Sequence, residues 1–107
     1  MINILYNFAM KKEYLEFYDQ ANDVLGVDFQ ILMAIEEMSE LTKELCKYLR
    51  CKKFNDVDGM EKVKANIIEE TADVLNVTEN MAYIFGEEEV NKERDFKIKR
   101  SIDRMNS

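Results

Sequence analysis

The sequence predicts an all-α domain, and three observations support this. The chain of 107 residues contains no proline and only three glycines, so little in it interrupts a helix. It is rich in Glu, Lys, Leu, Ile and Met, which together favour helices. Apolar residues recur at spacings of three and four, and no convincing strand pattern competes. We expect one domain over residues 1–107, a bundle-like subunit of four or slightly more helices.

The first two helices are predicted in the N-terminal half of the chain. The first covers about Lys11 to Val24 and ends near Gly26. The second begins at Asp28, a favourable N-cap residue, and continues to about Arg50. Its apolar residues keep helical spacing: Ile31, Ala34, Ile35, Met38, Leu41, Leu45, Tyr48 and Leu49.

The C-terminal half is predicted to hold a loop and two more helices. The segment from Lys52 to Gly59 is typical of a loop. A third helix runs from about Met60 to Phe85, and Gly86 ends it. A fourth, highly charged helix occupies roughly Glu88 to Met105, with sparse apolar residues. A subunit with so charged a last helix has a thin core, which favours a homo-oligomer.

Two short acidic motifs stand out within the apolar helical pattern. They are EEMSE at residues 36–40 and EETAD at residues 69–73. A helix turns by about 100° per residue, so Glu37 and Glu40 share one face of their helix. Glu70 and Asp73 share a face of the other helix for the same reason. Packing these faces together would gather four carboxylates into one site.

One acid of each motif is expected to point inward. Glu70 is in line with the apolar residues Ile67, Val74, Val77 and Met81. Glu37 lies between Met33 and Leu41, whereas Glu36 and Glu69 point away from the apolar arcs. A buried carboxylate costs several kcal/mol unless it is compensated, and no Lys or Arg lies between residues 65 and 92. A glutamate-rich run is more often a solvated surface, but two matched motifs favour a metal site.

The residue types indicate which metal ion would bind and argue against other kinds of metal site. Carboxylate oxygens without His or Cys suit Mg²⁺, and Mn²⁺ is also compatible. The chain has no histidine, which disfavours a helical di-iron site. Cys46 and Cys51 lack C-x-x-C spacing, which makes a zinc site improbable, and we interpret them as reduced thiols of a cytoplasmic protein.

Charge is unevenly distributed along the chain. Residues 91–107 carry a net charge of +3, which leaves −10 for residues 1–90. The acidic body disfavours binding to duplex nucleic acid. The basic last helix suits a polyphosphate ligand, although a solubilising amphipathic helix has the same pattern. No signal peptide and no apolar run of eighteen residues is present, so we expect a cytoplasmic protein that does not enter the membrane.

Together, these motifs resemble those of the MazG-like nucleoside triphosphate pyrophosphohydrolases of the all-α NTP pyrophosphatase superfamily. Residues 30–47 (QILMAIEEMSELTKELCK) are similar to the family's first metal-binding helix, and residues 67–75 (IIEETADVL) to its second. Residues 95–105 (DFKIKRSIDRM) resemble a Lys- and Arg-bearing helix of these proteins. The chain departs from the family in two ways: Glu40 and Glu70 are separated by a long gap of 29 residues, and no clear base-binding tryptophan or histidine is present.

The resemblance implies a magnesium-dependent enzyme. It would hydrolyse nucleoside or deoxynucleoside triphosphates between the α and β phosphorus atoms, releasing monophosphate and pyrophosphate. The implied residues are as follows: Glu37, Glu40, Glu70 and Asp73 bind metal, Glu36 is an accessory acid, Glu37 or Glu40 orients the attacking water and accepts its proton, and Lys47, Lys99, Arg100 and Arg104 are candidates for holding phosphates.

The sequence also offers further candidate substrate contacts and alternative functions. Asn76 and Asn80 are possible substrate contacts, and Phe8, Tyr14 or Tyr18 would stack on the base unless they serve the core or an interface. The family generally forms homodimers or dimers of dimers, which implies the same here. The alternative function is a non-catalytic helical module that binds nucleotide or metal. A coiled-coil regulatory dimer is the least favoured interpretation.

Overall fold

A computed structural model describes residues 10–107, and within these residues it is entirely helical. It contains four α-helices and no strand: α2 (Lys12–Leu25), α3 (Val27–Lys53), α4 (Val57–Phe85) and α5 (Glu87–Met105). The predicted fold class and the number of helices are therefore confirmed for this part of the chain. Phe8 lies outside the described residues.

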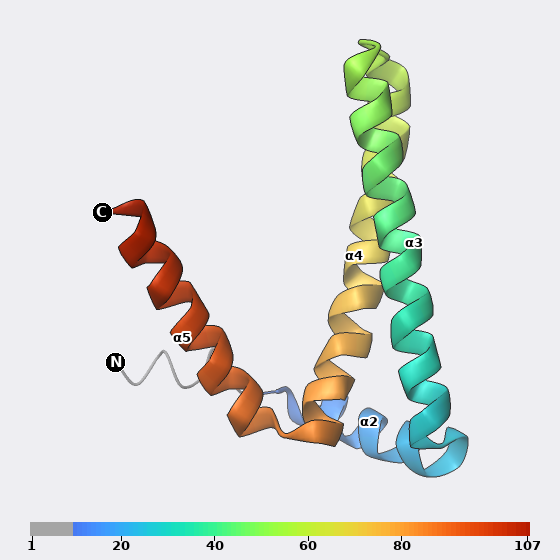
Figure 1. Cartoon of the computed structure of the whole chain (residues 1–107). Helices are drawn as coiled ribbons and strands as arrows, with labels where there is room; N and C mark the ends of the chain where they lie inside the picture. The colour runs from blue at the N-terminus through green and yellow to red at the C-terminus, as the bar shows by residue number, and fades with distance from the viewer. Residues whose placement is uncertain (1–9) are drawn as a thin grey trace.

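The long helices α3 and α4 form an antiparallel hairpin, which is the main packing unit (Figure 1). Ala34 on α3 and Val63 on α4 are buried in it. The apolar line predicted around Glu70 is half-buried along α4, as its helical spacing requires. The hairpin thus positions both acidic motifs on facing helices.

The connection between α3 and α4 is much shorter than predicted. The expected loop from Lys52 to Gly59 was wrong, because helix α3 continues through Lys53 and α4 already begins at Val57. Asp56 caps α4 by accepting a hydrogen bond of 3.0 Å from the backbone N–H of Gly59. Asn55 turns the chain with a φ of 54°, a left-handed conformation that asparagine tolerates. Local capping therefore allows a tight turn.

Helix α2 crosses the open end of the hairpin (Figure 1). Tyr18 and Ala21 are its buried residues. Gly26 joins α2 to α3 with a φ of 90°, which glycine adopts without steric cost. The expected N-cap at Asp28 was wrong: Gly26 is the N-cap, and Asp28 lies in the first turn, where its charge still favours the helix dipole.

Helix α5 leaves α4 at Gly86 and diverges from the hairpin, so that the molecule has the outline of a V (Figure 1). Its radius of gyration is 17.0 Å, against about 13 Å for a compact domain of this length. No residue of α5 is buried. The four helices therefore do not close into a bundle within one chain. None of the described helices is long and apolar enough to cross a membrane.

Candidate functional site

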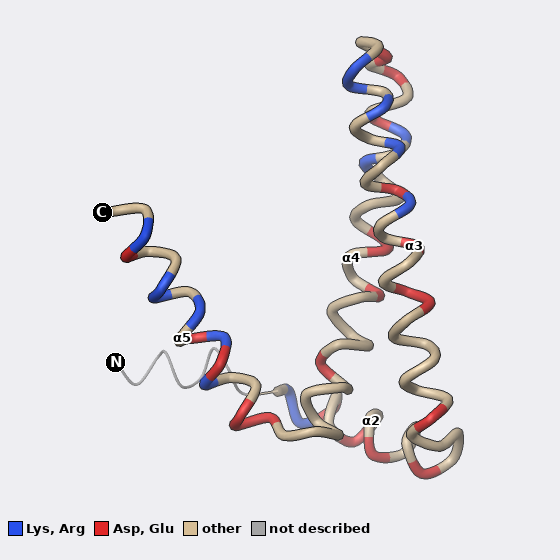
Figure 2. Tube along the Cα trace, viewed as in Figure 1, with Lys and Arg blue, Asp and Glu red and all other residues tan. Residues whose placement is uncertain are grey.

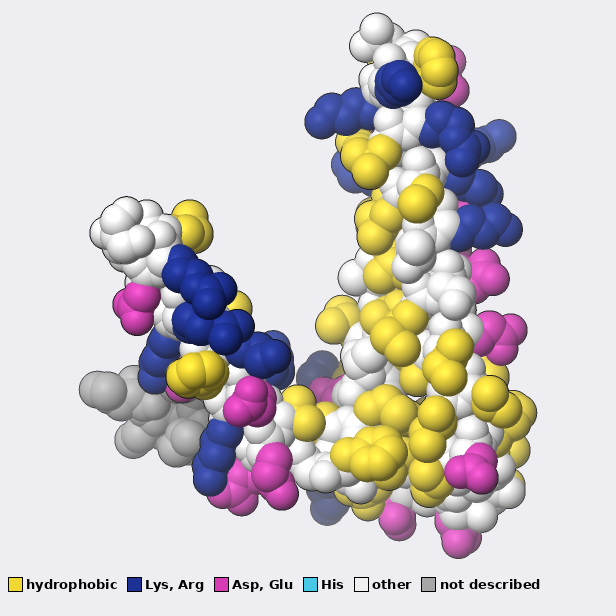
Figure 3. Space-filling model, in the orientation of Figure 1, with side chains coloured by type: hydrophobic (Ala, Val, Ile, Leu, Met, Phe, Trp, Pro, Cys, Tyr) yellow, Lys and Arg dark blue, Asp and Glu magenta, His cyan; other side chains and the backbone are white. Residues whose placement is uncertain are grey.

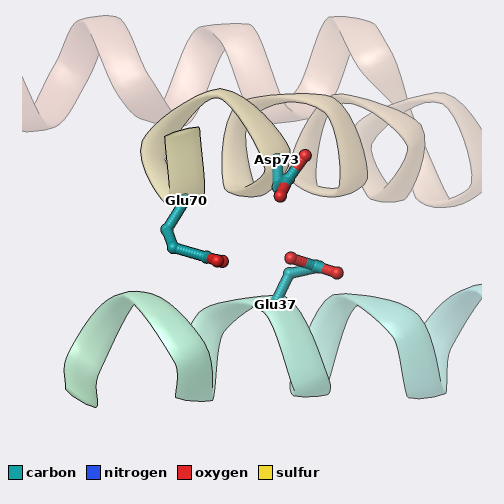
Figure 4. A group of neighbouring side chains, drawn as sticks. All are labelled: Glu37, Glu70 and Asp73. Carbon is teal, nitrogen blue, oxygen red and sulfur yellow. The ribbon is translucent and has the colours of Figure 1, made fainter. Parts of the chain in front are cut away.

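Three of the four predicted metal ligands meet between α3 and α4. Glu37 projects from α3, and Glu70 and Asp73 project from α4 towards it (Figure 4). Each offers a carboxylate oxygen, and these oxygens all lie within 4.8 Å of one another. We call these three residues the acid cluster. The i, i+3 spacing of Glu70 and Asp73 places both on the face of α4 that meets α3.

The cluster is electrostatically strained when it holds no cation. Burial raises the pKa of Glu37 above its ordinary value, and the nearby charges of Asp73 and Glu70 raise it further. Burial likewise raises the pKa of Glu70, followed by the charges of Asp73 and Glu40. Crowding of like charges therefore favours proton or cation uptake at this point.

One oxygen of the cluster is left without a partner. The Oε2 atom of Glu70 is buried and has no hydrogen-bond partner among the described residues. A buried acceptor of this kind costs free energy unless something binds it. Several carboxylate oxygens and no nitrogen or sulfur donor match the preference of Mg²⁺ and Mn²⁺. The residues present therefore fit a hard divalent cation.

The two remaining acids of the first motif lie at the margin of the cluster. Glu40 is exposed and outside the group of three, although it is near enough to raise the pKa of Glu70. Glu36 is also exposed, and its charge makes only the smallest contribution to the raised pKa of Glu37. Glu40 thus lies beside the cluster, while Glu36 acts on it only at a distance.

Lys47 makes a contact that the sequence did not suggest. Its Nζ atom lies 3.3 Å from a carboxylate oxygen of Glu44, which is only 7% exposed. The other oxygen of Glu44 accepts a hydrogen bond of 3.0 Å from the side chain of Asn66 on α4. Sequence reasoning missed Glu44 and Asn66. The signal was available, because Glu44 continues the inward line of Glu37 and Leu41 by one turn.

The basic residues of α5 are not brought to the cluster within one chain. Lys99 pairs with Asp95 at 2.8 Å, and the Arg100 guanidinium lies 5.6 Å from the centre of the Phe96 ring. Lys and Arg residues follow one another along the part of α5 that stands away from the hairpin (Figure 2). The predicted phosphate-binding residues Lys99, Arg100 and Arg104 therefore lie on a separate arm of the V.

Of the two predicted asparagines, Asn80 is committed to packing. It is 3% exposed and exchanges side-chain hydrogen bonds of 3.0 and 3.1 Å with Asn22 of α2. Its amide also donates to Gln30 of α3 at 3.3 Å. These bonds join three helices at the base of the hairpin. Asn80 is thus a structural link in this chain.

Asn76 lies instead beside a groove between α2, α4 and α5. The groove has a volume of about 580 Å³ and includes Tyr14, Leu75 and Ala82 in its lining. Tyr14 is partly exposed there, whereas Tyr18 is buried and donates a hydrogen bond of 2.7 Å to Glu79. Tyr14 and Asn76 therefore remain accessible, and Tyr18 serves the core.

Comparisons with known proteins leave the family assignment open. Scans against protein-family models, curated proteins and solved structures found no match to this chain. The case for a function therefore depends on the acid cluster and on the motifs that form it.

Proposed function

We propose that this chain is a divalent-cation-dependent nucleoside triphosphate pyrophosphohydrolase that acts as a homo-oligomer. The proposal depends chiefly on one observation, the acid cluster of Glu37, Glu70 and Asp73 with its unpartnered buried oxygen. The resemblance of residues 30–47 and 67–75 to the metal helices of the MazG-like family supplies the reaction. It releases nucleoside monophosphate and pyrophosphate.

The metal ligands in this proposal are Glu37, Glu70 and Asp73, with Glu40 completing the set. When bound, Mg²⁺ supplies positive charge that neutralises phosphate oxygens and favours deprotonation of a nearby water molecule. Glu70 contributes the oxygen that is buried without a partner, and Glu37 approaches it from the opposite helix. The hairpin thus holds the ligands before substrate arrives, which limits the cost of ordering them.

Glu40 is the better placed of the two candidate general bases. It is exposed and lies beside the three clustered carboxylates, so one of its oxygens can bind the cation while the other accepts a proton from an attacking water. Glu37 is enclosed between Glu70 and Asp73, which suits a ligand better than a base. Glu36, exposed on the neighbouring face, adds negative charge as the accessory acid.

Binding of the outer phosphates is assigned to Lys47 and to the basic residues of α5. Lys47 is held by Glu44 on the same helix as Glu37 and Glu40. Lys99, Arg100 and Arg104 carry donors that suit phosphate oxygens, but α5 diverges from its own acid cluster. In this proposal α5 therefore serves a site on another copy of the chain or closes onto its own hairpin when substrate binds.

Product analysis tests the reaction. Purified protein is incubated with a panel of NTPs and dNTPs, with Mg²⁺, with Mn²⁺ or with chelator, and products are separated by chromatography. We expect monophosphate and pyrophosphate with either metal, and a loss of at least a hundredfold in rate for Glu70→Gln. Glu69→Gln is the matched control, because it removes the same charge from the exposed neighbouring position, and it should retain activity. Diphosphate plus phosphate as products, or intact nucleotide in every reaction, contradicts the proposal.

Thermal unfolding measures metal binding separately from hydrolysis. Mg²⁺ should raise the melting temperature of the wild type and of Glu69→Gln, because a ligand of the folded state stabilises it. Glu70→Gln should lose that increase and should melt higher than the wild type in chelator, since one of the crowded charges is gone. Stabilisation by metal without hydrolysis would identify the alternative, a non-catalytic metal-binding module. A Mg²⁺ effect that is identical in Glu70→Gln and wild type excludes this metal site.

A further inference from the structure

The tip of the α3–α4 hairpin carries a concentration of cations, of which the proposed mechanism uses only Lys47. Residues 43–64, which form the closed tip, contain seven Lys or Arg against four Asp or Glu. Residues 27–42 and 65–85, which form the rest of the hairpin, contain eight acids and no Lys or Arg. Blue residues accordingly gather towards the tip and red ones towards the base (Figure 2). In a chain of net charge −7, such a separation favours an anionic ligand at the tip.

Three of these cations continue the face of α3 on which Glu40 lies. Glu40, Lys43, Lys47 and Arg50 follow one another at spacings of three, four and three, so they share one face of the helix. Along one edge of the hairpin, Lys and Arg side chains near the tip are followed by Asp and Glu side chains nearer the base (Figure 3). Because Glu40 lies beside the acid cluster, the cations lead from the cluster towards the tip.

Helix α4 adds a fourth cation, Lys62, to the same side. On each helix these cations are rotated by roughly 110° from the residues that face the partner helix, and in an antiparallel pair such rotations bring both sets to one side. Since Glu44 of α3 meets Asn66 of α4, Lys62 is level with about residue 48 of α3. These four cations form what we call the basic row: Lys43, Lys47, Arg50 and Lys62.

One cation of the basic row is anchored by a buried acid. Glu44 is 7% exposed, lies 3.3 Å from the Nζ atom of Lys47, and accepts a hydrogen bond of 3.0 Å from Asn66. A buried carboxylate is costly unless it is compensated, so this pairing restrains the Lys47 ammonium. The other three cations of the row are exposed and form no ion pair with an acid of the described residues. Their charges are therefore available to an anion.

The basic row is longer than a triphosphate requires. Measured along α3 from Glu40, Lys47 is about 10 Å away, Lys62 about 12 Å and Arg50 about 15 Å. In the proposed function the α phosphorus lies at the acid cluster, and Lys47 already suits the outer phosphates. The two cations beyond Lys47 therefore suit phosphates that follow the γ phosphate.

We propose that the basic row binds a linear phosphate chain longer than a triphosphate, which runs from the acid cluster towards the tip. The chain belongs either to a nucleotide or to free inorganic polyphosphate. A nucleotide as the ligand rests on the proposed function, whereas the binding of phosphates to the row does not.

A nucleoside tetraphosphate is the simplest nucleotide that would use the row. Water attacks its α phosphorus, the oxygen of the water stays on the monophosphate, and the proton passes to Glu40 and then to solvent. The bond between the α phosphorus and the bridging oxygen breaks, and the bridging oxygen keeps the electron pair. Tripolyphosphate then leaves in place of pyrophosphate.

Calorimetric titration with inorganic polyphosphates tests the row without a nucleotide. The protein is titrated with tripolyphosphate and with linear hexaphosphate, with Mg²⁺ in both solutions. We expect the wild type to bind hexaphosphate about fivefold more tightly or better, because only the longer chain reaches every cation of the row. Lys62→Gln and Arg50→Gln should each weaken hexaphosphate binding by about fivefold or more.

Lys64→Gln is the matched control for Lys62→Gln. Lys64 is exposed on the same helix and carries the same charge, but it lies about 200° away around the helix. Its substitution should change the affinity for hexaphosphate by less than about twofold. Equal affinities of the wild type for the two polyphosphates, or equal losses in Lys62→Gln and Lys64→Gln, overturn the proposal.

Kinetics with nucleotides distinguishes the two sources of the phosphate chain. The preferred NTP is compared with the corresponding nucleoside tetraphosphate, which should yield monophosphate and tripolyphosphate. Lys62→Gln should lower the ratio of kcat/KM for the tetraphosphate to kcat/KM for the triphosphate by about threefold or more, and Lys64→Gln should keep the ratio of the wild type. A ratio that is unchanged in Lys62→Gln contradicts a nucleotide as the ligand. Polyphosphate binding as expected, without hydrolysis of any nucleotide, supports a site for free polyphosphate and counts only against the catalytic proposal.

Discussion

At the residue scale, Glu44 and Glu70 occupy similar inward positions, but their pKa values are shifted in opposite directions. Both are glutamates on lines that face the α3–α4 contact. Glu44 is satisfied by Asn66 and Lys47, and these partners lower its pKa. Glu70 faces other carboxylates, and burial together with their charges raises its pKa. Glu44 is therefore compensated within the hairpin, whereas the surroundings of Glu70 favour uptake of a proton or a cation.

The pH dependence of stability separates the role of Glu44. Its folded pKa lies below the ordinary value of 4.5, so its contribution is fully present above that pH and is lost as the pH falls through the lowered pKa. We expect Glu44→Gln to lower the free energy of unfolding at pH 7, and the difference from wild type to shrink below pH 4.5. Urea unfolding at several pH values measures this. Glu61→Gln, an exposed position near the tip, should show no such change, and a pH-independent effect of Glu44→Gln contradicts the assignment.

At the scale of elements, several polar contacts join α2 to the hairpin. Tyr18 donates to Glu79, and Tyr83 donates to Asp19 at 3.1 Å, which links α2 and α4 in both directions. Asn22 and Asn80 add a reciprocal amide pair. Directional bonds of this kind fix the angle at which α2 crosses, whereas a small apolar contact would leave it variable.

Removing one member of the amide pair should therefore be costly. Asn80→Ala leaves the half-buried side chain of Asn22 without its partner, and we expect a loss of about 1–3 kcal/mol in the free energy of unfolding. Denaturant titration measures the loss. Asn76→Ala, one turn earlier on α4 and exposed, should change stability by less than about 0.5 kcal/mol. Equal effects of the two substitutions would mean that the amide pair adds nothing.

At the scale of the whole molecule, one chain buries very little. Tyr18, Ala21, Ala34 and Val63 are its buried apolar residues within the described part of the chain. Large hydrophobic side chains are exposed on all four helices. If the chain forms a homo-oligomer, as proposed above, we expect folding and association to be coupled.

Coupled folding makes thermal stability depend on concentration. If two chains form the folded unit, each tenfold dilution should reduce the apparent free energy of unfolding by about 1.4 kcal/mol per dimer. The melting temperature, followed by circular dichroism from about 100 µM to 1 µM, should fall accordingly. A constant melting temperature in the wild type would indicate a monomer that is stable alone.

The sequence by itself determined the all-helical class and the inward acids Glu37 and Glu70. It also determined the end of α2 near Gly26, the end of α4 at Gly86 and the start of α5 just after it. Helical periodicity and the conformations open to glycine are local properties, so the amino-acid sequence alone reveals them. The same local reading erred at Asp28 and in the segment from Lys52 to Gly59. There, Gly26 and Asp56 are the N-caps, so α3 and α4 begin earlier than expected, and helix propensity alone did not identify these positions.

Only the tertiary structure decided which side chains meet. It joined Asp73 to Glu37 across the hairpin, paired Glu44 with Asn66, and committed Asn80 to Asn22. It also separated the basic residues of α5 from the acid cluster. These outcomes depend on the crossing angles of the helices and on their relative positions along their axes. Both arise from contacts between residues distant in sequence. Helical periodicity fixes the face of a residue, and packing fixes the partner on that face.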